Sequence, residues 1–119
     1  MKILLVPDAK LRQKAKDLKK ITQKEIEISK KMIELMLKEP GVGLAANQIG
    51  VLKKIITINI PNEEKNTNKT YALFNPKIIH YSKKKIMMEE GCLSLPKQYA
   101  EIERSEKIIV NYLNDENNL

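Results

Sequence analysis

The sequence predicts an α+β domain in which short antiparallel strands pack around one amphipathic helix. Residues 22–38 carry an apolar stripe with helical spacing behind a clear start signal. Several runs of four to six β-branched or apolar residues follow, which is typical of strands. The segments between these runs are too short for crossover helices, so the strands are expected to pair antiparallel.

Length and composition limit the class of protein. The chain has 119 residues, enough for one domain with a single core, and 42% of them are hydrophobic, which argues against intrinsic disorder. No apolar run approaches the roughly 20 residues of a membrane span, and no signal-peptide pattern opens the chain, so no membrane partner is expected. A single cysteine cannot form an internal disulfide, which favours a reducing, cytoplasmic setting and leaves bacterial, viral or organellar origin open.

The net charge is +7, and it comes almost entirely from lysine, since the only arginines are Arg12 and Arg104. Aromatic residues make up 4% and tryptophan is absent, so platforms for stacking on single strands are scarce and no sequence-specific nucleic acid is expected. Codon bias in an AT-rich genome explains much of the lysine. A loose, salt-sensitive association with ribosomal RNA stays open as a second interpretation.

The first forty residues are expected to hold the helix. The apolar run 3–6 stops at Pro7, and residues 9–15 predict a short helical turn. Thr22 to Glu25 form a capping-box pattern that opens a helix to about Lys38. The core-facing stripe is predicted to consist of Ile26, Ile33 and Leu37, widened by Ile28, Met32, Leu35 and Met36.

The rest of the chain is expected to be mainly strands. Residues 55–60 predict a strand, and the polar stretch 61–70 predicts a surface loop. Two strands, 71–74 and 78–81, are expected on either side of a break at Asn75-Pro76.

Beyond this point one more strand is predicted. Residues 82–85 indicate a basic turn, and residues 86–88 lead into a cysteine-containing motif. A last strand over 107–113 is followed by the turn-forming run 114–118, so the chain is expected to end inside a turn.

Residues 41–48, Gly-Val-Gly-Leu-Ala-Ala-Asn-Gln, form the first motif. Its glycines permit a close approach, so a peptide can lie against the backbone of Val42 to Leu44. Gln48 offers two amide hydrogens, suited to an oxygen that becomes negative during acyl transfer. The alternative is a glycine turn followed by a helix start, with Gln48 exposed.

Residues 89–96, Glu-Glu-Gly-Cys-Leu-Ser-Leu-Pro, form the second motif and contain the only cysteine. Cys92 can be a buried small hydrophobe, a nucleophile or a thiolate ligand of zinc or ferrous iron. Gly91 allows an unusual backbone, and the Leu93 N–H can face the same oxygen as Gln48. Glu89 is expected to be solvated, whereas Glu90 either forms a salt bridge, for which Arg104 is the candidate, or contacts substrate.

The two motifs, about forty residues apart, resemble the first and second signature motifs of the peptide deformylases, GxGLAxxQ and EGCLS. Smaller matches at Leu11-Arg12, Asn75-Pro76 and 104–107 extend the resemblance from about Val6 to Leu113. It implies a hydrolase that removes the formyl group from the N-terminal formyl-methionine of newly made proteins. Its partners would be N-formyl-methionyl peptides and nascent chains, and its cofactor a divalent metal, usually Fe²⁺, replaceable by Zn²⁺, Ni²⁺ or Co²⁺.

The resemblance also implies roles for individual residues. Cys92 matches the thiolate metal ligand, and Gln48 and the Leu93 backbone match the groups that steady the formyl oxygen. The positions that match peptide docking and the methionine pocket are Val42, Gly43, Leu44, Met88, Gly91 and Leu93.

The family's third motif, His-Glu-x-x-His on a C-terminal helix, is absent from the 119 residues, and the one histidine, His80, lies at a position that the family does not use for metal. Three hypotheses follow. The chain is an incomplete deformylase domain lacking that helix, or an inactive remnant that binds peptides or another subunit. The third is a cysteine hydrolase that pairs Cys92 with His80, and two acids before the cysteine disfavour it.

Overall fold

The computed structural model describes residues 2–6, 8–39, 41–62 and 64–114, with side chains throughout except at 95–100. The elements are two 3₁₀ helices, one α-helix and six strands: η1 (Ala9–Arg12), α1 (Gln23–Lys38), β1 (Gly43–Ala45), η2 (Ala46–Ile49), β2 (Ile55–Asn62), β3 (Thr67–Tyr81), β4 (Lys85–Cys92), β5 (Leu95–Ser105) and β6 (Ile108–Leu113).

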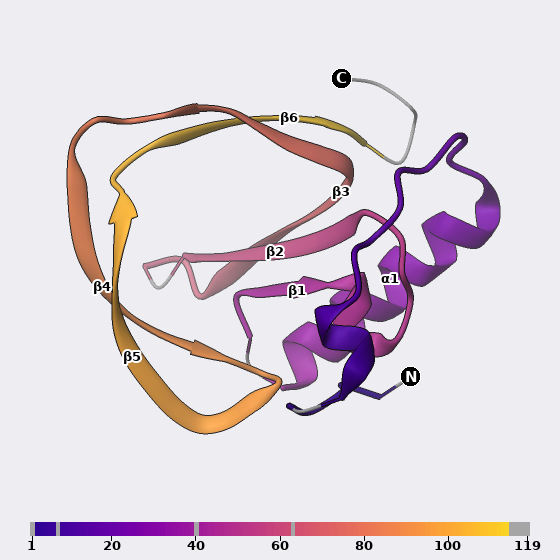
Figure 1. Cartoon of the computed structure of the whole chain (residues 1–119), viewed down its shortest axis with the longest axis horizontal. Helices are drawn as coiled ribbons and strands as arrows, with labels where there is room; N and C mark the ends of the chain where they lie inside the picture. Colours follow the sequence, from indigo (N-terminus) through magenta and orange to yellow (C-terminus); the bar gives the residue numbers. More distant parts are fainter. Residues whose placement is uncertain (1, 7, 40, 63, 115–119) are drawn as a thin grey trace.

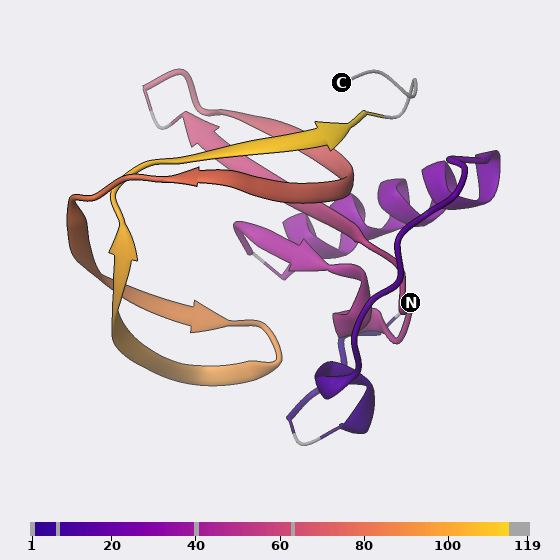
Figure 2. The ribbon, with the colours of Figure 1, turned by 45° about the horizontal axis from the view of Figure 1, so that its top comes forward.

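The strands form two antiparallel sheets, one with the order β1-β2-β3-β6 and one hairpin of β4 and β5 (Figure 1). Helix α1 lies against the larger sheet, while the β4–β5 hairpin curves away from it (Figure 2). The predicted α+β class is therefore confirmed. In the part of the chain that the structure describes, no helix has the length and apolar content to cross a bilayer.

Helix α1 begins where the capping box predicts. The Glu25 carboxylate turns back and accepts hydrogen bonds from the N–H of Thr22, at 3.2 Å, and from the Thr22 hydroxyl. Its other oxygen lies 3.2 Å from Nζ of Lys53, just before β2. Glu25 is buried, so these partners join the start of the helix to the entrance of the sheet.

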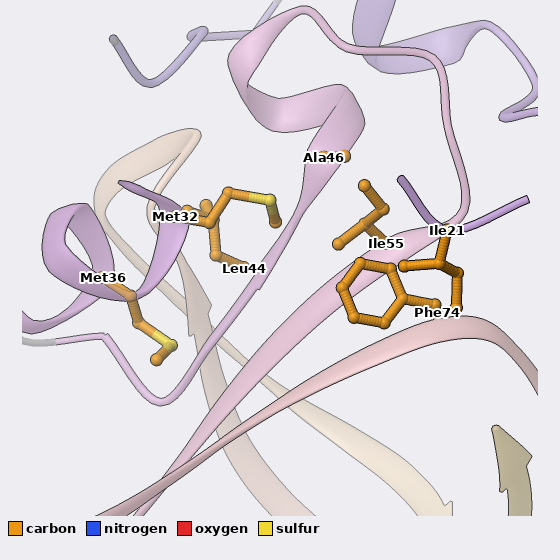
Figure 3. Close-up of a cluster of buried hydrophobic side chains, with 7 residues drawn as sticks. All are labelled: Ile21, Met32, Met36, Leu44, Ala46, Ile55 and Phe74. Carbon is orange, nitrogen blue, oxygen red and sulfur yellow. The ribbon is translucent and has the colours of Figure 1, made fainter. Parts of the chain in front are cut away.

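The buried stripe of α1 is centred on Met32 and Met36, both fully buried. They pack in a core cluster with Ile21, Leu44, Ala46, Ile55 and Phe74 (Figure 3). The predicted stripe was wrong at Leu37, which is 41% exposed. The sheet meets the helix along the 32/36 row, and Leu37 is rotated by 100° from Met36 towards solvent.

The predicted loop over 61–70 was wrong, because β2 continues through Pro61 to Asn62 and pairs with β3 from Thr67 onward. Strand β1 pairs only with residues 56–58 of β2, so beyond that point one edge of β2 is open. A proline can stand on an open edge because the N–H that it lacks has no ladder partner there.

The predicted break at Asn75-Pro76 is also absent, because β3 runs through it as one long strand. Asn75 has a φ of 50°, and the pairing with β6 shifts register between Phe74 and Lys77, so the irregularity is a bulge inside the strand. The Asn75 amide accepts from the N–H of Leu18 at 2.7 Å and donates to the Leu18 carbonyl at 2.8 Å. The bulge therefore anchors the chain segment that precedes α1.

Three further elements differ from the sequence prediction. The helical turn at 9–15 is a 3₁₀ helix of four residues, and β1 and β5 were not predicted as strands. The described side chains of β5 are mostly polar and exposed, so no apolar alternation marks it. The turn predicted at 114–118 lies, except for Asn114, outside the described residues.

Glu25 should make the free energy of unfolding depend on pH. The hydrogen bond from the Thr22 side chain, with a further contribution from Lys53, lowers the pKa of Glu25 from 4.5 to about 2. A carboxyl whose pKa is lower in the folded state stabilises the fold above its unfolded pKa and loses that contribution as pH falls towards 2. We expect Glu25→Gln, which can still fill a capping box, to remove on the order of 1–2 kcal/mol of the stability lost between pH 5 and pH 2.

Urea unfolding at pH 7, 5, 3 and 2 measures this change. The control is Glu27→Gln, at an exposed position on α1, which should keep the wild-type pH dependence. An identical pH dependence in wild type and Glu25→Gln would contradict the prediction.

Asn75 should contribute to the free energy of unfolding in two separate ways, through the hydrogen bonds of its side chain and through its left-handed backbone. Asn75→Gly keeps the positive φ but leaves two groups of Leu18 unpaired, which we expect to cost about 1–2 kcal/mol in urea unfolding. Asn75→Ala should cost about 1 kcal/mol more, because a Cβ disfavours the left-handed region. Asn66 has a similar φ of 52°, so Asn66→Gly is the control and should be neutral. Wild-type stability in Asn75→Gly would show that the anchor contributes nothing.

Candidate active site

The side chain of Gln48 is held in one orientation by its own 3₁₀ helix. Helix η2 follows β1 directly and ends at Gly50, whose φ of 82° suits a residue without a Cβ. The side-chain oxygen of Gln48, Oε1, accepts a hydrogen bond from the N–H of Ala45 at 2.9 Å. This bond directs the amide nitrogen away from β1.

The amide nitrogen of Gln48 points at the second motif. Nε2 donates to Oγ of Ser94 at 3.1 Å and lies 3.4 Å from Sγ of Cys92. Ser94 is buried, whereas Cys92 is exposed, so the Gln48 amide contacts both a buried and a solvent-exposed residue of the site. The alternative in which Gln48 projects freely into solvent does not hold.

The N-terminal segment and a glycine fix this arrangement from the other sides. The N–H of Leu4 donates to the backbone carbonyl of Gln48 at 2.6 Å, and the N–H of Val6 donates to the backbone carbonyl of Ser94 at 3.0 Å. A Cβ on Gly41 would lie only 2.8 Å from Cδ1 of Leu93, so the absence of a side chain lets the two motifs close on each other.

Strand β1 presents an open edge beside these groups. It pairs with β2 on one side only, and the Val42 carbonyl accepts from the N–H of Asn59 at 2.9 Å. Because peptide groups alternate along a strand, those of Gly43 point to the unpaired side. Val42 is 70% exposed, whereas the Leu44 side chain is buried in the core.

The remaining predicted positions lie on or next to β4. Met88 is 46% exposed and pairs with Ile102, and the exposed Gly91 pairs with Tyr99. The side chain of Leu93 packs against the core cluster. The structure thus brings Cys92 and Leu93 of the second motif next to the first motif, which includes Gln48. Met88 lies further along β4, away from this contact.

Glu90 forms the salt bridge that was one of its two predicted roles. Arg104 binds it with both arms, Nη2 to Oε1 at 2.9 Å and Nε to Oε2 at 3.0 Å. The Arg104 hydrogen bonds lower the pKa of Glu90, so the carboxylate stays ionised. This pair ties β4 to β5.

Ser94 is the residue that the sequence interpretation missed. The second motif predicts no role for it, although its hydroxyl takes the shorter hydrogen bond from Gln48. A small polar residue two positions after the cysteine, followed by Leu95-Pro96, was the available signal.

The sequence model described as Polypeptide deformylase matches residues 1–119. The chain belongs to the polypeptide deformylase family. Among curated relatives, the peptide deformylase of Buchnera aphidicola subsp. Acyrthosiphon pisum is 43% identical over 114 residues, which is 96% of this chain and 64% of the relative. That of Rhizobium meliloti is 36% identical over 96% of this chain and 65% of its own length.

Solved deformylase structures agree with the fold. The peptide deformylase of Ehrlichia chaffeensis has a TM-score of 0.93 at 34% identity, covering 99% of this chain and 70% of that one. The Acinetobacter baumannii class I type b deformylase bound to Met-Ala-Ser has a TM-score of 0.88 at 26% identity, covering 99% and 79%. The chain spans 63–65% of the length of the first curated relatives that it matches.

Membership in the deformylase family implies a divalent metal, which needs a set of protein donors grouped around one point. Cys92 is an accessible sulfur donor, and its Sγ lies 3.4 Å from the Gln48 amide nitrogen. Within the described ranges no three His, Cys, Asp or Glu side chains are grouped to hold an ion. His80 pairs with Ile109 in the larger sheet, whereas Cys92 ends β4 in the other. These residues do not fit a catalytic metal site, which needs three protein ligands.

Gly41→Ala should displace the side chain of Leu93, which packs against Gly41 where the two motifs meet. The new methyl group would overlap Leu93, and we expect a loss of about 1–2 kcal/mol in urea unfolding. Adding Leu93→Ala should relieve the overlap, so that the double variant loses clearly less than the sum of the single ones.

Gly43→Ala is the matched control on the same motif. A Cβ there would meet only the Thr57 carbonyl at 3.7 Å, an ordinary contact, so stability should change by about 0.5 kcal/mol or less. Additive effects of Gly41→Ala and Leu93→Ala would exclude the proposed contact.

Proposed function

We propose that this chain carries the peptide- and formyl-binding part of a peptide deformylase, a hydrolase that removes the N-formyl group from the N-terminal formyl-methionine of newly made proteins. One observation carries the proposal. The Gln48 amide lies within hydrogen-bond reach of Cys92 and Ser94, beside the open edge of β1.

Gln48 is suited to steady the formyl oxygen. Its side-chain oxygen accepts a hydrogen bond from the Ala45 N–H, so the amide N–H groups point to the Cys92 side of the site. A donor that is already oriented loses little by reorganising when negative charge develops on an oxygen. We assign the Leu93 N–H as a second donor, next to the cysteine in the chain.

The open edge of β1 is suited to hold the peptide. An extended peptide can add as a strand to an unpaired edge, with main-chain hydrogen bonds giving affinity and pockets giving specificity. Gly43 directs its peptide groups to that edge without a side chain in the way. Val42 and Leu44 flank it, and Met88, Gly91 and Leu93 are assigned to the methionine side chain. The Met-Ala-Ser bound to the Acinetobacter baumannii relative is the chemical class of ligand expected here.

Cys92 is assigned as one thiolate ligand of a divalent metal, Fe²⁺ by family resemblance, or Zn²⁺, Ni²⁺ or Co²⁺ in its place. The other ligands are not among the described residues, so Cys92 receives a place in a metal site and no step of the reaction. The same observation favours a second candidate function, a peptide-binding protein without catalysis. In both cases we propose a cytoplasmic setting, nascent chains as partners and a loose association with ribosomes.

The decisive experiment extends the chain at its carboxyl end with a helix carrying His-Glu-x-x-His and measures hydrolysis of formyl-Met-Ala-Ser. The extended protein should cleave the peptide and hold about one metal ion, which Cys92→Ser should release. Gln48→Ala should lower kcat by about 10²–10³-fold, the usual loss for one oxyanion donor, with unchanged metal content.

Gln13→Ala, which changes an exposed glutamine, is the control and should leave kcat unchanged. Binding of formyl-Met-Ala-Ser without cleavage would favour the peptide-binding function. Full turnover in Gln48→Ala would mean that Gln48 has only a structural role.

A further inference from the structure

A lysine-rich segment, residues 14–20, is fixed along one side of the molecule, and we call it the strap. The N–H of Lys16 donates to the Leu52 carbonyl at 3.0 Å, and the N–H of Lys54 donates to the Lys16 carbonyl at 2.9 Å. The Asn75 amide holds both peptide groups of Leu18. Figures 1 and 2 both show this segment beside the connection between η2 and β2. The strap is therefore a built surface, although it is neither helix nor strand.

The strap turns its apolar residues inward and its lysines outward. Ala15 and Leu18 are half-buried, and Ile21, one position beyond the strap in the same spacing, is in the core. The exposed residues between them are Lys14, Lys16, Asp17, Lys19 and Lys20. The apolar residues are three positions apart, so one face of the strap packs against the domain and the other carries the lysines.

The strap itself carries four lysines and one acid, and further basic residues flank it in the sequence. Residues 10–24 contain seven lysine and arginine residues and one acid, against a net charge of +7 for the 119 residues. The single acid, Asp17, is already paired with Lys54 at 2.9 Å. The Lys54 hydrogen bond lowers the pKa of Asp17, and Lys14 and Lys77 add to the effect, so these lysines gather around the strap.

We propose that the strap, with the neighbouring Lys54 and Lys77, binds the phosphate backbone of structured RNA. The proposal rests on the proposed function in one respect, since a protein that acts on nascent chains works next to ribosomal RNA. Lysines on a fixed, extended segment can neutralise successive phosphates. Reading of bases is not expected, because the strap offers no helix for a groove and no aromatic side chain for stacking.

A membrane surface is the less favoured partner. Membrane-binding segments pair basic residues with apolar side chains that enter the lipid boundary. In the strap the apolar side chains face the domain, so nothing on the basic face can insert.

The test uses the 119-residue chain and a fluorescein-labelled RNA hairpin, followed by fluorescence anisotropy between 50 and 200 mM KCl. Wild type should bind with a log–log salt slope of about −3, as for about four phosphate contacts. Replacing the four strap lysines by glutamine should weaken binding at least tenfold and make the slope clearly shallower. The four positions are Lys14, Lys16, Lys19 and Lys20.

The matched control removes the same charge elsewhere, by changing the exposed Lys38, Lys65, Lys83 and Lys107 to glutamine. It should weaken binding no more than about threefold. Equal weakening in both variants would overturn the proposal, because net charge alone would explain it, and so would unchanged binding in the strap variant. Circular dichroism shows whether each variant is folded.

Three further measurements keep the proposal independent of any variant. In NMR titration of wild type with the hairpin, the shifted amides should cluster at residues 14–20, 53–54 and 77, and shifts elsewhere would overturn it. Binding to vesicles with phosphatidylserine but not to RNA would overturn it in favour of a membrane. A DNA duplex of the same sequence should bind no more tightly than the hairpin. No peptide substrate is present, so failure here leaves the proposed hydrolase untouched.

Discussion

The Gln48 amide is the interaction on which the relation between the two sheets depends. Its oxygen is bound to the N–H that ends β1, and its nitrogen is bound to Ser94 and Cys92 in the turn of the β4–β5 hairpin. Among the described residues, Leu93 and the backbone of Val6 also join the hairpin to the domain near this end. The Gln48 side chain therefore links the two halves of the site, while Leu93 and the Val6 backbone also hold the hairpin in place.

The two glycines of the first motif serve different needs. At Gly41 a methyl group would enter the space of Leu93, so the close packing of the two motifs favours a glycine there. Gly43 has room for a Cβ and an ordinary φ, so nothing within the described chain demands a glycine there. A glycine that packing does not require, on an open strand edge, is what the close approach of another backbone needs.

How far the sequence predicts the structure depends on where the deciding contact lies. The α1 start was predictable, because Thr22 and Glu25 are neighbours that need only each other. The continuity of β3 was not, since the left-handed Asn75 is held by Leu18, far away in the chain. In the site, Gln48 and Cys92 followed from motif resemblance, whereas the role of Ser94 depends on how the two motifs meet in space.

The N-terminal segment connects the two proposed surfaces, the candidate site and the strap. Residues 4–6 are bound to Gln48 and Ser94 through the backbone, and the strap is bound to the entrance of β2 and to the bulge in β3. Backbone hydrogen bonds leave side chains free, so the lysines can serve a partner while the same segment supports the site. RNA on the strap would thus hold the domain from one side and leave the open edge of β1 to a peptide. The proposed anchoring and the proposed chemistry require different atoms, which is why they can be tested separately.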